Sequence, residues 1–235
     1  GPPGRPVKDE RAVLVMAKAP RPGLAKTRLA PMLGDDRCAS LQAALITRAA
    51  TTATAVAPGA TFLAFDPPDA REELAGLVPP GVELVPQRGR HLGERLAGAV
   101  ADVSAAHRGP LVVVGTDIPL LEPRHLRDAF MALAGGDDVV LGPAHDGGYY
   151  LAGMTRPVPS LFDIDPELWG GPDVLAATVA RVEANGLRCH LLEALRDLDT
   201  PEDAVALAAE PSLPSELRPL LCGPVAVSPG DRSHG

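Results

Sequence analysis

Short runs of apolar residues recur along the chain, and most are followed by a polar turn and then by apolar residues at helical spacing. Leu111-Val112-Val113-Val114 is the clearest run, and it lacks the alternation of polar and apolar positions that a half-exposed strand shows. It therefore predicts a strand buried on both faces, as in a parallel sheet covered by helices. Comparable runs predict strands over residues 12–17, 61–65, 82–85, 138–142 and 187–192.

The segments between these strands carry helix signals. Asp35 and Asp36 open a stripe of apolar residues at helical spacing that ends before Pro58. Thr200 and Pro201 supply the cap and first residue of a later helix. Other helices are expected to end near residues 77 and 106 and to cover residues 123–134 and 172–185. This alternation of strands and helices predicts a three-layer α/β domain.

Composition and charge limit the organisation and the partners. The 235 residues are 46% hydrophobic and 3% aromatic, so aliphatic side chains must fill the core. We expect a disordered or tag-derived N-terminus (1–10), one domain (11–210) and a Pro/Ser/Gly-rich tail (211–235) with a short helix near residues 216–221. The net charge of -8 argues against nucleic-acid binding. Three scattered cysteines and the lack of a long apolar stretch indicate a cytoplasmic protein without a membrane span, and a homodimer is compatible with the sequence.

Asp117 stands directly after the clearest strand, behind Gly115 and Thr116. Ligands of open α/β sheets bind at the carboxyl ends of the strands, and a carboxylate there is suited to a hard divalent cation. A helix cap or a closed turn explains Asp117 equally well when its position alone is considered.

A loop rich in Pro, Gly and cations follows the first strand, and four of its eleven residues (18–28) are Lys or Arg. Such a loop can wrap phosphates with backbone amides while its cations neutralise them, although its spacing is neither a Walker A nor a Rossmann motif. A solvated basic loop is the alternative. The residues expected to bind nucleotide or phosphate are Ala17, Lys18, Pro22, Gly23, Lys26, Arg28, Arg90, Gly93 and Thr116.

Two further loops are candidates for binding the base or the acceptor. The first, residues 86–96, is basic and contains His91, which we expect to be a loop or capping histidine and not a catalyst. The second contains an Asp-Gly-Gly triplet, which permits close approach of the backbone to a ligand but also favours an ordinary hairpin turn. The residues expected to bind the acceptor are His145, Asp146, Gly147, Gly148 and Trp169, the last in an irregular segment that could act as a lid.

Asp197 and Asp199 alternate, so in an extended segment both side chains point the same way. The helix cap at Thr200 leaves them unexplained. Carboxylates at two strand ends and cations at two others suit Mg²⁺-dependent handling of a nucleotide, in which the metal bridges phosphate oxygens. We therefore expect Mg²⁺ (or Mn²⁺) to be held by Asp117, Asp197 and Asp199.

Five motifs in this order carry a resemblance to a known family: MAKAPRPGLAKTRL, QRGRHLGERL, VVVGTDIPLL, VVLGPAHDGGYYLAG and LRDLDTPEDA. Over residues 12–209 the sequence resembles the DUF2064 family of the GT-A superfamily, whose members are generally described as glycosyltransferase-like, some in arsenosugar biosynthesis. The resemblance implies a GT-A (nucleotide-diphospho-sugar transferase) fold: three αβα layers around a mostly parallel mixed sheet, with a nucleotide half and an acceptor half.

A more distant resemblance is to the guanylyltransferases that act on 2-phospholactate or phosphoenolpyruvate. It is carried by the Ala-Lys-Thr-Arg-Leu loop (residues 25–29), by Asp117 and by the Asp-x-Asp at Asp197 and Asp199, and it implies that these aspartates hold Mg²⁺. The His-Asp-Gly-Gly-Tyr-Tyr stretch (145–150) departs from that family's pattern, which leaves base and acceptor open.

Three functions remain. The first is a nucleotidyltransferase that moves a nucleoside monophosphate from an NTP to a small phosphorylated or oxyanionic acceptor, such as phosphoenolpyruvate; Lys26 and Arg28 hold the polyphosphate and Asp117 holds the metal. The second is a glycosyltransferase that uses an NDP-sugar, with Asp146 acting on the acceptor hydroxyl. The third is a non-catalytic nucleotide-binding module. The Lys-Thr-Arg loop favours the first, because a pyrophosphate leaving group needs that positive charge.

Overall fold

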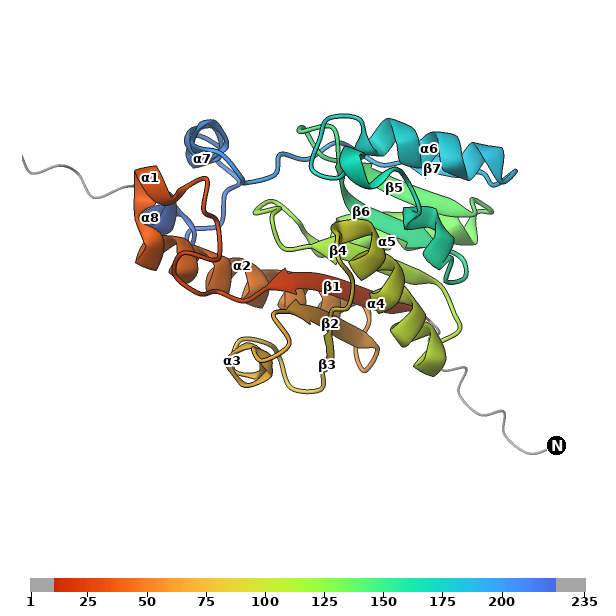
Figure 1. Ribbon diagram of the computed structural model, residues 1–235, viewed down its shortest axis with the longest axis horizontal. Coiled ribbons are helices and arrows are strands. Elements are labelled where there is room, and N and C mark those ends of the chain that lie inside the picture. The colour runs from red at the N-terminus through yellow and green to blue at the C-terminus, as the bar shows by residue number, and fades with distance from the viewer. Residues whose placement is uncertain (1–10, 223–235) are drawn as a thin grey trace, which may run out of the picture.

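The computed structural model of the protein describes residues 11–222, which form a seven-stranded sheet between two layers of helices (Figure 1). The strand order is β3-β2-β1-β4-β6-β5-β7. Only β6 runs antiparallel to its neighbours among these strands. The strands are β1 (Ala12–Lys18), β2 (Thr61–Asp66), β3 (Glu83–Pro86), β4 (Leu111–Gly115), β5 (Val139–Pro143), β6 (Tyr149–Met154) and β7 (Cys189–Leu191). The predicted three-layer fold with a mostly parallel mixed sheet is confirmed.

Helices cover both faces of the sheet, which explains the uninterrupted apolar runs of β1 and β4. Val13 and Val15 face one layer, whereas Ala12 and Leu14 face the other, and all four are fully buried. The first layer contains α2 (Asp35–Val56), α3 (Arg71–Ala75) and α5 (Pro123–Ala134); the second contains α4 (Leu92–Ala106), α6 (Val174–Ala184) and the short 3₁₀ helix η1 (Pro159–Phe162). No helix within residues 11–222 is long and apolar enough to cross a membrane.

The strand β6 is absent from the sequence-based prediction, which treats residues 143–153 as a ligand-binding loop. In the structure, β5 and β6 form an antiparallel hairpin that places β6 between β4 and β5. The Asp-Gly-Gly triplet forms the turn of this hairpin. Of the two interpretations of the triplet, the ordinary hairpin turn is confirmed. The glycines of this hairpin obscured the pattern: a Cβ at Gly142 would lie 2.5 Å from Cζ of Tyr150, so the ring needs that glycine.

A third, smaller core gathers helices from the two ends of the chain. It joins α1 (Ala30–Leu33), the start of α2, α7 (Pro201–Ala208) and α8 (Arg218–Leu221), and Figure 1 shows α1, α7 and α8 at one end of the molecule. Leu213, Leu217 and Leu221 are buried in it. The packed domain therefore continues past the boundary expected at residue 210, and the short helix expected near 216–221 is α8. Residues 1–10 and 223–235 lie outside the described residues.

Candidate active site

One cavity of about 560 Å³ opens at the carboxyl ends of β1 and β4, which is the edge where the sequence places its candidate residues. Its volume falls in the range of small-molecule sites. The expected residues that line it are Ala17, Lys18, Lys26, Arg28, Thr116, Asp117, Asp146, Gly148, Trp169, Asp197 and Asp199. The sheet thus brings together side chains that are up to 182 positions apart (17 to 199).

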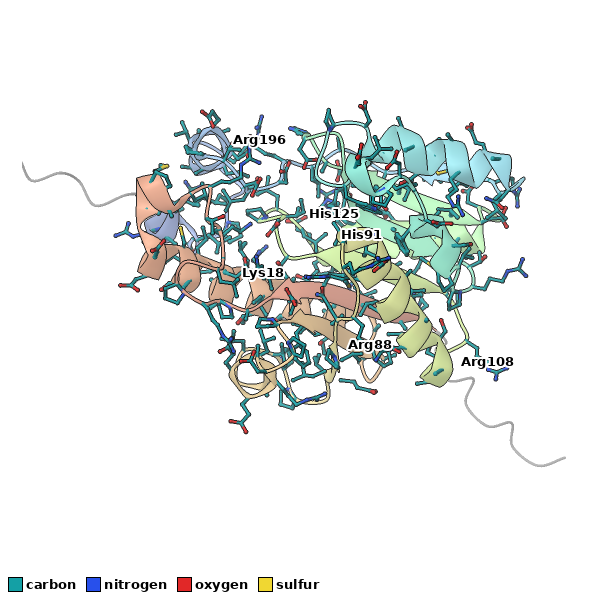
Figure 2. The ribbon with its side chains drawn as sticks, viewed as in Figure 1. Lys18, Arg88, His91, Arg108, His125 and Arg196 are labelled. Atoms are coloured by element: carbon teal, nitrogen blue, oxygen red, sulfur yellow. The ribbon has the colours of Figure 1, made fainter. Side chains whose placement is uncertain are left out.

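The loop after β1 presents Lys26 in an unusual conformation. Lys26 has φ +53°, the only positive φ of a non-glycine residue between residues 11 and 222. Left-handed backbone at a residue with a Cβ costs on the order of 1–2 kcal/mol, so the surrounding contacts must impose it. Two neighbours anchor the loop, because Ala25 and Leu29 are buried. Lys18, at the carboxyl end of β1, remains exposed (Figure 2).

The Lys26 ammonium is enclosed, with a side chain only 3% exposed. Its Nζ donates to Oδ1 of Asp117 at 2.5 Å and to the carbonyl oxygen of Leu198 at 2.6 Å. Leu198 N–H in turn donates to the carbonyl oxygen of Asp117 at 2.8 Å. These three contacts join the basic loop, the end of β4 and the segment before α7 into one unit.

A second ion pair joins the same elements at the surface. Arg28 Nη1 lies 2.6 Å from Oδ2 of Asp199, and their side chains are 67% and 41% exposed. Thr200 caps α7 as expected, since its side chain accepts from Asp203 N–H. Arg196 Nη1 donates to Oδ1 of Asp203 at 3.0 Å, which holds the segment before α7 against that helix (Figure 2).

Asp197 and Asp146 form the part of the cavity without ion pairs among the described residues. Asp197 is 8% exposed, and burial together with the nearby charge of Asp146 raises the pKa of its carboxyl to about 6. Asp146 Oδ1 accepts from Gly148 N–H at 2.8 Å, which fixes the carboxylate at the hairpin turn. Within residues 11–222, therefore, no ion pair compensates the negative charge of these two carboxylates.

The donor set suits a divalent cation, because carboxylates are preferred ligands of Mg²⁺ and Mn²⁺ and five of them line one cavity. Within residues 11–222, however, no three Asp, Glu, His or Cys side chains converge into a ready-made metal site. Two of the expected ligands are paired with cations: Asp117 with Lys26 and Asp199 with Arg28.

Several expected site residues lie outside the cavity lining. Arg90 points to solvent, 89% exposed, and pairs with Glu94. His145 donates its N–H to the carbonyl oxygen of Leu195, beside the hairpin turn. Pro22 and Gly23 belong to the basic loop but do not reach the cavity.

Two of the expected glycines have packing roles. A Cβ at Gly93 would lie 2.5 Å from Nε1 of Trp169, so this glycine lets the indole pack against α4. Gly147 has φ +92°, and a Cβ there would lie 2.1 Å from the carbonyl oxygen of Pro172. The close approach predicted for the Asp-Gly-Gly triplet is therefore made to the chain itself. His91, by contrast, caps α4 as expected, with Nδ1 accepting from Glu94 N–H.

The cavity is also lined by polar residues that the sequence analysis did not single out, among them Gln42 and Asp66, and Gln87 and Arg95 from the candidate loop 86–96. Arg95 Nη1 lies 2.8 Å from Oδ2 of Asp66, at the end of β2. Gln87 Nε2 donates to the carbonyl oxygens of Ala17 and Ala64 (3.1 and 2.9 Å). The rule that selected Asp117, a carboxylate directly after a buried strand, would also have selected Asp66.

An aromatic wall faces the carboxylates. Tyr149 and Trp169 meet edge to face, with ring centroids 6.4 Å apart, and both line the cavity. Burial raises the pKa of the Tyr149 hydroxyl, so the phenol stays protonated at neutral pH. This wall offers apolar contact next to the charged part of the cavity.

Comparison with known proteins shows the family and the fold. A family described as "Uncharacterized protein conserved in bacteria (DUF2064)" matches residues 45–166. A solved structure from Desulfovibrio desulfuricans G20, provisionally described as a nucleotide-diphospho-sugar transferase, is 28% identical with a TM-score of 0.76, and the match covers 90% of this chain and 96% of that one. No curated protein matches the chain.

Two more distant structures share the fold. One is a CMP:2-keto-3-deoxy-manno-octonic acid synthetase complexed with CTP (14% identity, TM-score 0.54, covering 84% of this chain and 96% of that one). The other is 4-diphosphocytidyl-2C-methyl-D-erythritol synthase from Anaerococcus prevotii DSM 20548 (8% identity, TM-score 0.52, covering 81% and 90%). At these identities the likeness concerns the fold.

Proposed function

The chain belongs to the DUF2064 family, and from that premise we propose that it is a metal-dependent nucleotidyltransferase. It would transfer a nucleoside monophosphate from an NTP to a small phosphorylated or oxyanionic acceptor and release pyrophosphate. One observation carries the proposal: the cationic loop that contains Lys26 and Arg28 contacts the carboxylates of Asp117 and Asp199 at the mouth of one cavity. Cations and carboxylates side by side are what a triphosphate and its metal ion require.

The proposed reaction needs no nucleophile from the protein. An oxygen of the acceptor attacks the α-phosphorus in line, and a new P–O bond forms. The bond from the α-phosphorus to the oxygen that bridges to the β-phosphorus breaks, and pyrophosphate leaves with that electron pair. The work of the chain is to position the reactants and to stabilise the charge that develops on the phosphate oxygens.

Each part of the cavity has a role in this scheme. Lys18, Lys26 and Arg28 would neutralise the β- and γ-phosphates, since all three line the cavity on the side of β1. Mg²⁺ or Mn²⁺, when bound, would supply Lewis-acid polarisation of the phosphate oxygens, and Asp117, Asp197 and Asp199 would hold it. The hairpin residues Asp146 and Gly148 would meet the acceptor on the other side.

Glycosyl transfer is the second candidate, and it is favoured by the provisional description of the Desulfovibrio desulfuricans G20 protein. In that reaction Asp146 would take the proton of an acceptor hydroxyl, and a nucleoside diphosphate would leave. The leaving group separates the two candidates, because pyrophosphate forms only in the first.

The test is an assay of pyrophosphate release. The protein is incubated with each of the four NTPs, Mg²⁺ and a panel of acceptors that includes phosphoenolpyruvate and other small phosphorylated acids. We expect pyrophosphate with one NTP and one acceptor class, and none after addition of a chelator. Silence with every NTP, together with turnover of a UDP- or GDP-sugar, would reject nucleotidyl transfer in favour of glycosyl transfer. Nucleotide binding without turnover of any substrate would indicate a binding module.

A further inference from the structure

The ammonium of Lys26 is placed where it can compete with a metal ion. It contacts Oδ1 of Asp117, the carboxylate that ends β4, and its own side chain is 3% exposed. The Asp117 side chain is 53% exposed, so the lysine approaches from the protein side while the rest of the carboxylate faces the cavity. A compact ammonium of this kind is a point charge with three donors.

The two ion pairs of the site differ in burial. Arg28 and Asp199 are both largely exposed, so water and salt screen their attraction. Lys26 is enclosed and has a second acceptor, the carbonyl oxygen of Leu198, 2.6 Å from Nζ. Its left-handed backbone further indicates that the fold constrains this residue. The contact of Lys26 with Asp117 is therefore less screened by water and salt than the contact of Arg28 with Asp199.

We propose that Lys26 is an internal counter-ion that occupies Asp117 in the free protein, and that a divalent cation must displace its ammonium to use that carboxylate. The statement rests on the proposed function for the identity of the metal and its ligands. It explains why carboxylates that line one cavity form no ready-made site of three ligands within residues 11–222.

The proposal has a consequence for the order of binding. Once displaced, Lys26 loses its anionic partner Asp117, so a bare metal ion binds weakly. A triphosphate that enters with the metal offers the displaced ammonium new anionic oxygens. Nucleotide and metal therefore raise each other's affinity, and the coupling passes through Lys26.

Binding of Mn²⁺ without nucleotide, followed by electron paramagnetic resonance of the free ion, tests the competition. We expect Lys26→Gln to bind Mn²⁺ about tenfold more tightly than the wild type, because the competing cation is gone. The same variant should bind NTP more weakly, because the ammonium no longer meets the phosphates. Lys26→Arg restores the positive charge and should return Mn²⁺ binding toward the weak wild-type level.

Arg28→Gln is the matched control for the general effect of removing one positive charge. Since the pair of Arg28 with Asp199 is exposed, we expect only a small gain in Mn²⁺ affinity. Equal or weaker Mn²⁺ binding by Lys26→Gln, or an equal gain in both variants, would overturn the proposal.

A measurement on the wild-type protein covers the case in which Lys26→Gln does not fold. Acetylation of Lys26 by an amine-reactive ester, followed by mass spectrometry, should become faster when Mn²⁺ is added, because the ammonium leaves its enclosed position. Unchanged labelling at saturating Mn²⁺ also contradicts the proposal. These readouts need no turnover, so absence of pyrophosphate release from every NTP would reject the proposed function and leave this inference standing.

Discussion

The two walls of the cavity are built by different forces. The wall on the side of β1 is held by ion pairs between distant segments, namely Lys26 with Asp117 and Arg28 with Asp199. The wall on the side of the hairpin is held by close packing, in which Trp169 lies against Gly93 and Pro172 against Gly147. Ion pairs can exchange partners when a charged ligand arrives, whereas packed contacts cannot. We therefore expect the first wall to be sensitive to substitutions that change charge, and the second to be sensitive to substitutions that change side-chain volume.

Removal of the Asp117 carboxylate should have the largest effect. Asp117→Asn keeps the shape but loses the charge that would hold the metal, so pyrophosphate release should fall by about 10²–10³-fold. Metal-dependent nucleotide binding should be lost, while circular dichroism should show an intact fold. Loss of the Lys26 partner should lower the free energy of unfolding by about 1–3 kcal/mol. Unchanged metal-dependent binding would mean that the metal lies elsewhere.

Gly147→Ala tests the packed wall at its tightest point. The new Cβ would lie 2.1 Å from the carbonyl oxygen of Pro172, and the residue already has φ +92°. Overpacking and backbone strain together should lower the free energy of unfolding by about 3 kcal/mol, measured by denaturant titration. Gly148→Ala is the control, because its nearest neighbour would be 3.2 Å away and its φ is not positive. A similar loss in both variants would show that the whole turn, and not this contact, is sensitive.

The raised pKa of Asp197 predicts a pH dependence of stability in metal-free buffer. Its carboxyl has a pKa of about 6 in the folded protein against an ordinary aspartate value of 3.8, so folding favours the protonated form. The stabilisation is complete below the lower value and is lost as the pH rises through about 6. Relative to Asp197→Asn, the wild type should lose about 2 kcal/mol of unfolding free energy between about pH 4 and pH 7. A difference that stays constant with pH would contradict the prediction.

Gly93→Ala should disturb the aromatic wall more gently. The new methyl group would meet Nε1 of Trp169 at 2.5 Å and the carbonyl oxygen of Phe162 at 2.8 Å, and the indole can move. We expect a loss of about 1–2 kcal/mol in unfolding free energy. Trp169 is the single tryptophan, so a shift in its fluorescence reports the displacement directly. Gly98→Ala makes the same change on α4 with a nearest contact of 3.2 Å, and it should leave the fluorescence unchanged.

Arg90→Gln should have the smallest effect of the set. Its guanidinium is 89% exposed, pairs with Glu94 in the first turn of α4, and lies outside the cavity lining. The denaturation midpoint and the nucleotide affinity should both be unaffected, because water and salt screen an exposed ion pair. A clear loss of nucleotide affinity would restore Arg90 to the phosphate-binding role that its sequence position suggests.

The sequence was sufficient for the elements whose apolar pattern is continuous. The run from Leu111 to Val114 predicts a strand because both faces of that strand are buried, which makes the run continuously apolar. The end of the run then places Asp117 at a strand end. The strand β6 was missed because Gly148 and Gly153 flank or interrupt its apolar run, and the close packing of Gly153 against Val112 depends on a partner that is distant in sequence.

The candidate site was predictable in its charges but not in its pairings. Strand ends located Lys26, Asp117, Asp197 and Asp199, all of which line the cavity. That Lys26 binds Asp117 while Arg28 binds Asp199 could not be predicted, because these pairs join positions 91 and 171 residues apart. Arg90 looked like a phosphate ligand because nothing in the local sequence reveals that its side chain points to solvent, just before α4, and pairs with Glu94.

The small core at the end of the molecule has a practical consequence. Leu29 and Leu198 are both fully buried in it, one beside the cationic loop and the other between Asp197 and Asp199. Leu213, Leu217 and Leu221 complete that core from the far end of the described chain. An engineer who trims the protein after residue 210 would delete no residue that lines the cavity, yet would remove the leucines that pack against the two cavity-lining segments around Leu29 and Leu198. Fusion partners and truncations should therefore be placed beyond Leu221.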